Sequence, residues 1–197
     1  MDTGGIEVGL LEKRVKKPRS LQILVILATV FHTALCLVLL ILYEKLRDLS
    51  TRGTAAIIGA AMGGLGECLL QLYTKKYSFS DILRFQVWGV LNGIWTRCWT
   101  EKLIFHLKQK PLMILVDQLF GNPLSIFFFI GLTAFWKGYD IDLYIQKNYL
   151  PALKLSLIIW PIASTLQFTV IPRNFILIFN IVVSFIWVIV LGVFTSQ

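Results

Sequence analysis

The sequence predicts an all-α membrane protein, a polytopic bundle of five to six transmembrane helices. Of its 197 residues, 56% are hydrophobic and only 15% are Asp, Glu, Lys or Arg, whereas soluble domains carry roughly a quarter charged residues. Apolar stretches close to the length that crosses a bilayer recur along the chain. The net charge of +8 comes largely from Lys and Arg near the ends of these stretches, where they meet lipid headgroups. The partner that this pattern predicts is lipid, not nucleic acid.

The N-terminal third divides into a tail and two hydrophobic stretches. Residues 1–20 form a polar, basic tail, and residues 21–43 are an apolar stretch long enough to be a retained membrane span. The remainder, residues 44–197, is expected to form one multispanning bundle. Its first helix is expected over residues 54–73, where Gly59 and Gly63 place two bare backbone patches on one helix face. Such a pair favours close packing against another helix.

The next two expected helices contain polar interruptions. Residues 82–107 hold several charged residues among tryptophans, which is typical of an amphipathic or bundle-facing helix, and whether this helix spans the membrane stays open. Residues 111–136 are strongly apolar, and Pro123 is expected to bend their helix, because proline lacks a helical donor.

The C-terminal part is expected to contain two more helices. After a polar connector at residues 137–148, a helix is expected over 149–168, with Pro151 in its first turn. Pro161 predicts a break or bend within that helix. A last apolar helix is expected over 175–194.

Ionisable side chains inside these apolar stretches are the candidate functional residues. A charge at the bilayer centre costs about 2.5–3.5 kcal/mol on insertion scales, so Glu67 and Asp117 need partners or water. Arg84, Arg97 and Lys110 are the nearest candidate partners by sequence.

The amides near these acids extend the candidate set. Gln71 shares a helix face with Glu67, and Asn122 shares one with Gln118. Two interpretations remain open. These groups line a hydrated path for a small polar solute, or they only join helices through hydrogen bonds.

No assembled catalytic or metal site is expected. His32 and Cys36 lie one helical turn apart, but no second pair of metal ligands accompanies them. Three widely spaced cysteines favour buried thiols over a disulfide framework. No nucleophile motif is present, so we expect neither an enzyme nor a cofactor.

The C-terminal third carries a specific pattern. Trp160 and Pro161 are followed at fixed intervals by Phe168, Pro172 and Trp187. This spacing resembles the Mpv-seventeen and peroxisomal membrane protein family, small multispanning proteins of mitochondrial inner and peroxisomal membranes. The resemblance extends from about residue 47 to residue 194.

Upstream residues agree with the same family. Asp117 and Gln118 followed by Pro123, and Gly66 and Glu67 followed by Gln71, resemble its earlier segments. Asp81, Arg84 and Gly89 resemble the segment between them.

Several positions depart from the family pattern. Glu67 stands where the family usually has Asp, Ser164 where it has Gln, and Gln167 where it has Asn. Residues 21–43 have no counterpart in the usual four-span core. The chain therefore resembles a divergent member with an added N-terminal helix.

The resemblance implies permeation of small solutes across an organelle membrane. By this resemblance, the polar lining would include Glu67, Gln71, Asp117, Gln118 and Gln167, while Pro123, Pro161 and Pro172 would bend the helices around it. We therefore expect a pore or path for small polar metabolites, formed by one chain or by a homo-oligomer. The alternative is a non-conducting scaffold or organiser that acts through partner proteins.

The organelle is expected to be the peroxisome. A basic cluster next to the first apolar stretch, without a mitochondrial presequence, favours the peroxisomal membrane over the mitochondrial inner membrane. A vacuolar or other endomembrane location stays open.

Overall fold

A computed structural model describes residues 19–195 of the chain, and most of the expected tail at residues 1–20 lies outside this range. Within the described residues the fold is all-α, as predicted, and contains no strand. In chain order the helices are α1 (Arg19–Ile41), α2 (Tyr43–Leu49), α3 (Thr51–Thr74), α4 (Phe79–His106), α5 (Lys110–Val116), the π-helix η1 (Asp117–Gly121), α6 (Asn122–Lys137), α7 (Ile141–Thr169), the 3-10 turn η2 (Arg173–Phe175) and α8 (Ile176–Thr195).

Four described segments are long and apolar enough to cross a membrane. They are Arg19–Ile41, Thr51–Thr74, Lys110–Lys137 and Ile141–Thr169. Helix α4 is as long but carries more charged side chains. Many large apolar side chains on these helices point outward, such as Leu27 and Phe128. The protein is therefore a multispanning membrane protein whose outer surface suits lipid.

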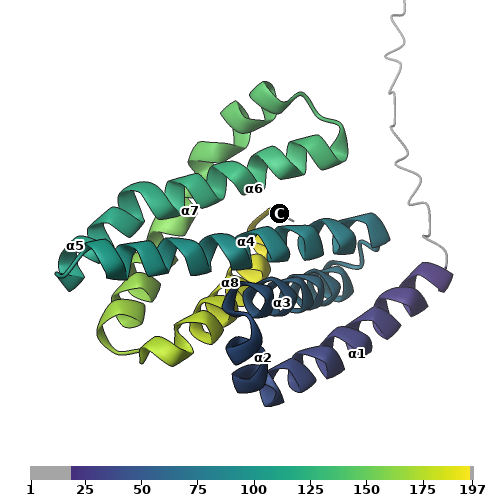
Figure 1. Cartoon of the computed structure of the whole chain (residues 1–197). Helices are drawn as coiled ribbons and strands as arrows, with labels where there is room; N and C mark the ends of the chain where they lie inside the picture. The colour runs from purple at the N-terminus through teal and green to yellow at the C-terminus, as the bar shows by residue number, and fades with distance from the viewer. Residues whose placement is uncertain (1–18, 196–197) are drawn as a thin grey trace, which may run out of the picture.

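The hairpin formed by α3 and α4 occupies the middle of the bundle (Figure 1). Helix α1 packs on the outer side of α3, whereas α6 and α7 pair with each other and reach the hairpin through α4. Helix α8 returns to contact α3 and α4. Helices distant in sequence thus enclose a common interior.

The seam between α3 and α4 is made by glycines. A Cβ atom built on Gly59 would lie 2.1 Å from the carbonyl oxygen of Gly89, and one on Gly93 would lie 2.2 Å from that of Ala55. A Cβ on Gly63 would lie 2.4 Å from the Phe85 carbonyl oxygen. The two backbones therefore touch directly. In lipid the hydrophobic effect does not drive helices together, so close van der Waals contact of this kind stabilises their association.

The expected connector at residues 137–148 is wrong for most of its length, because only residues 138–140 separate the two helices. Helix α6 ends at Lys137 and is capped by Gly138, whose φ of 68° suits glycine. Helix α7 then begins at Ile141, because the Asp140 side chain accepts a hydrogen bond of 2.9 Å from the Leu143 N–H and caps the helix.

The prolines of α7 lie inside the helix. The early start places Pro151 in its interior rather than in its first turn. The helix also continues to Thr169 without the break considered at Pro161.

Pro123 acts upstream of its own position. It cannot donate to the carbonyl four residues earlier, and just before it the N–H of Asn122 bonds to the carbonyl of Asp117, five residues back. The result is the π-helix η1, in which the hydrogen bond closes over one residue more than in an α-helical turn. Proline therefore reshapes the turn that carries Asp117 and Gln118.

Candidate functional site

A cavity of about 100 Å³ lies inside the bundle, lined by residues of α3, α4, η1, α6, α7 and α8. Aromatic rings form much of its wall. Its polar side chains include Asp117, Asn122, Gln167 and Asn180. Three of these are among the sequence-predicted candidates, whereas Asn180 was not.

Asp117 is held by neutral donors. The Trp99 indole Nε1 donates to its Oδ1 at 2.8 Å, and the Ser164 hydroxyl and the Gln118 amide donate to its Oδ2. Among the described residues it has no ion pair with a Lys or Arg, so the expected partners Arg84, Arg97 and Lys110 do not fill this role. Hydrogen-bond donors therefore replace water around this carboxylate.

The network continues through two serines of α7. The Gln118 Nε2 donates to the Ser164 hydroxyl at 2.8 Å, and the Asn122 Nδ2 donates to the Ser156 hydroxyl at 3.1 Å. Both serines are buried. Sequence reasoning missed them as site residues, although their spacing of eight places them on the same face of α7.

The amides deeper in the cavity are less fully bonded. Gln167 Nε2 lies 3.3 Å from the Thr100 hydroxyl, a long hydrogen bond. Asn180 is 4% exposed, and no partner for its amide is found within the described residues. These amides are therefore the groups with free capacity to bind a solute.

Glu67 and Gln71 form a separate cluster outside the cavity lining. Gln71 Nε2 donates to Glu67 Oε1 at 2.9 Å and to the Ser78 carbonyl at 2.8 Å, while its Oε1 accepts from the Ser78 N–H. Gln71 thus joins the end of α3 to the cap of α4.

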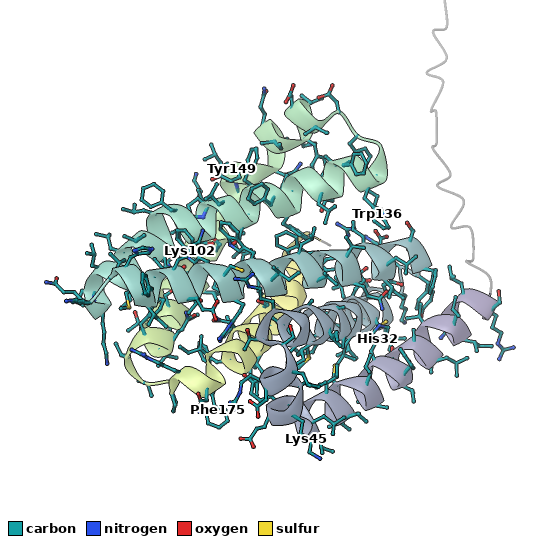
Figure 2. All side chains as sticks on the ribbon, in the orientation of Figure 1. His32, Lys45, Lys102, Trp136, Tyr149 and Phe175 are labelled. Carbon is teal, nitrogen blue, oxygen red and sulfur yellow. The ribbon has the colours of Figure 1, made fainter. Side chains whose placement is uncertain are left out.

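Arg84 belongs to the same end of the bundle and also does not line the cavity. Its guanidinium donates to the Thr133 hydroxyl at 2.7 Å and lies 3.4 Å from Asp81. Asp81 also pairs with Lys137 at 2.5 Å. In the same region the Trp136 indole donates to Ser80 (Figure 2). These contacts join α4 to α6.

The residues of the C-terminal pattern have different environments. Trp160 and Trp187 line the cavity. Phe168 is buried against Leu103 and Met113, and Pro172 precedes the turn η2. Among the described residues, no three His, Cys, Asp or Glu side chains gather to hold a metal.

A second, larger pocket of about 460 Å³ lies at the end of the bundle where α4 ends and α8 begins. We call it the arginine pocket, because its charged lining residues are Arg47, Arg97, Glu101 and Arg173. It shares three lining residues with the cavity: Thr96, Thr100 and Asn180. The two hollows therefore adjoin at these residues.

Comparisons with known proteins relate the chain to one family. The model of the Mpv17 / PMP22 family matches residues 137–192. PXMP2/4 family protein 2 of Dictyostelium discoideum is 31% identical, over 79% of this chain and 88% of that protein. Protein sym-1 of Neurospora crassa is also 31% identical, over 68% of this chain and 86% of that protein.

With a third relative, this chain matches a smaller share of the other protein. A protein of Saccharomyces cerevisiae named as a vacuolar membrane protein is 28% identical, over 59% of this chain and 42% of that protein. No solved structure matches the chain.

Proposed function

Because the chain belongs to the Mpv17 / PMP22 family and is a multispanning organelle-membrane protein, we propose that its cavity is part of a path for small polar solutes. The role is transport and not catalysis. The single observation that carries this proposal is the junction of the cavity with the arginine pocket at Thr96, Thr100 and Asn180.

The polar lining of the cavity favours a path for solutes rather than a dry structural core. Asn180 lines the cavity, and its amide has no hydrogen-bond partner among the described residues. An amide kept from water without a partner destabilises a protein by about 1–3 kcal/mol. Water or a polar solute in the cavity would satisfy it. A bundle whose polar groups served only to join helices would have less reason to leave this amide free.

The size of the cavity limits what passes in this conformation. A volume of about 100 Å³ holds only a few water molecules. Phe85, Trp88 and Phe129 stand in its wall. Passage of a metabolite therefore requires these rings or their helices to move, and we expect slow, gated flux of small solutes.

The test is solute flux and single-channel current with the purified protein in liposomes. Asn180→Leu should close the junction between the two hollows and reduce flux at least several-fold. Asp117→Asn should alter conductance or ion selectivity in protein that remains folded. Asn148→Leu is the matched control, because Asn148 bonds only to the Tyr144 carbonyl of its own helix and lies outside the cavity lining.

A scaffold is the competing function, and one observation favours it. Asp117, Gln118, Asn122 and the two serines satisfy one another across η1, α6 and α7, as purely structural hydrogen bonds would. If folded protein conducts nothing, or if Asn180→Leu leaves flux unchanged while Asp117→Asn only lowers thermal stability, the scaffold is the better function.

We further propose a peroxisomal location, supported by the basic cluster before the first span. The mitochondrial inner membrane is the next candidate, and the vacuole stays open because one relative is named as a vacuolar membrane protein. Colocalisation of the tagged full chain with peroxisomal, mitochondrial and vacuolar markers decides among them. We also propose that the protein assembles into a homo-oligomer. The mass of the purified protein in detergent, measured by light scattering, tests whether more than one copy is present.

A further inference from the structure

The charge of the arginine pocket is unbalanced. Its lining holds three arginines and one acid, Glu101. Arg97 Nη2 pairs with Glu101 at 2.6 Å, but its Nε is buried and has no acceptor within the described part of the chain. The pocket therefore keeps a net positive charge.

The other two arginines are not neutralised by the lining. Arg47 lies 3.3 Å from Asp48, but the Asp48 side chain is 72% exposed and does not line the pocket. Arg173 is exposed and has no ion pair among the described residues. Even with Asp48 included, three positive charges face two negative ones.

The positions of Arg47 and Arg173 are fixed relative to each other. The buried Tyr43 hydroxyl donates to the Asn174 carbonyl at 2.8 Å, which ties α2 to the turn η2. The Arg47 guanidinium lies 5.8 Å from the Tyr43 ring centre, within cation–π range. Burial raises the pKa of the Tyr43 phenol, although Arg47 and Arg97 lower it, so the phenol remains a donor at neutral pH.

We propose that the arginine pocket binds small anions with a carboxylate or phosphate group and admits them selectively to the path. This inference rests on the proposed function. Guanidinium groups present paired donors that match these oxygens, and a concave site with low-dielectric walls concentrates counter-charge. Thr96, Thr100 and Asn180 offer neutral donors at the inner end.

Asp117 opposes this selection inside the cavity. It is the carboxylate of the cavity lining, and the hydrogen bonds that its oxygens accept from Trp99, Ser164 and Gln118 come from neutral groups, which do not cancel its charge. Selection therefore takes place at the pocket, and tight binding inside the cavity is not expected.

The first test is the reversal potential of the full chain in phosphatidylcholine membranes under a salt gradient. Wild type should favour anions, and Arg47→Gln and Arg173→Gln should each lower the anion-to-cation permeability ratio roughly two-fold. This follows from Coulomb's law at about 8 Å in a water-like medium screened by physiological salt, because the lost charge acts with opposite sign on the anion and the cation. Glu101→Gln should change the ratio in the opposite direction. Arg19→Gln is the control, because it removes an equal charge far from the pocket lining.

A second test does not depend on conduction. Millimolar inorganic phosphate should raise the melting temperature of the wild-type protein in neutral detergent, and the Arg47→Gln/Arg173→Gln double variant should lose this shift. Stabilisation by an anionic lipid but not by phosphate would show that the pocket binds a lipid headgroup. It would refute the binding of a soluble anion.

The outcomes separate the two proposals. Conduction without anion preference, or with a preference that the pocket variants leave unchanged, refutes the anion site and leaves the path standing. Absence of conduction refutes the path, and the phosphate shift then decides alone whether the pocket binds anions.

Discussion

Replacement of Gly89 by alanine tests the backbone contact between α3 and α4. The new Cβ would lie 2.0 Å from the Gly59 carbonyl oxygen, whereas ordinary contacts begin at 3.4 Å. The helices would have to separate locally by about 1.4 Å, the difference between these two distances. The atom it meets is backbone, so no side-chain rotation relieves the overlap.

The expected loss follows from two opposing effects. Overpacking costs about 1–3 kcal/mol, and alanine in a helix offsets about 0.5–1 kcal/mol of this relative to glycine. We expect Gly89→Ala to destabilise the protein by about 1–2 kcal/mol. At roughly 2–4 °C per kcal/mol for a chain of this size, the melting temperature in detergent should fall by roughly 2–8 °C.

Gly131→Ala provides the control for helix propensity. A Cβ atom on Gly131 of α6 would meet nothing within 4 Å, so only the propensity gain remains and stability should hold or rise slightly. Thermal unfolding of both variants, followed by loss of the monodisperse peak on size exclusion, measures the difference. Equal melting temperatures for Gly89→Ala and wild type would refute the direct backbone contact.

Two further substitutions test hydrogen bonds between elements. Ser164→Ala removes a donor to Asp117 and should cost about 1 kcal/mol, within the range measured for membrane helices. Thr165→Ala should cost less, because that hydroxyl bonds only within its own helix; equal melting temperatures would argue against a structural role for the Ser164 bond. Tyr43→Phe removes the bond to Asn174 and should cost about 0.5–1.5 kcal/mol. It should also speed proteolysis at the turn η2, and an unchanged cleavage rate would contradict the tie.

The fold could be predicted from the sequence because lipid imposes simple rules. Apart from the start of α7, apolar length alone located the ends of the long helices to within a few residues, and the expected helix over 54–73 corresponds to α3, Thr51–Thr74. The start of α7 was mistaken because polar residues suggested a loop. The Asp140 side chain caps α7, so the same polar residues form the first turns of this helix at the edge of the apolar region.

The candidate site could be predicted only in part. Asp117, Asn122 and Gln167 were predicted as site residues because they are polar residues in apolar stretches. The structure brings them to one cavity. Glu67 was predicted for the same reason but lies in another cluster. Composition identifies polar side chains inside the membrane, but it does not show which helices bring them together.

The pairing of the predicted polar groups also needed the structure. Charge balance suggested arginine or lysine partners for Asp117, whereas the actual donors are an indole, an amide and a hydroxyl. Ser156 is too small and too common to stand out in the sequence. Gly89 and Gly93 repeat the spacing of Gly59 and Gly63, and that signal could have identified the partner helix.

The glycine seam between α3 and α4 also sets an order of assembly during synthesis. Only residues 75–78 separate these helices, so their pairing closes a very short loop and should occur early. Helix α8, which completes the cavity wall, leaves the ribosome after the other described helices. Until it docks, the nascent bundle presents the polar face of its cavity to lipid. A chain truncated before α8 should therefore be recognised by membrane quality control and degraded, although its first hairpin is already formed.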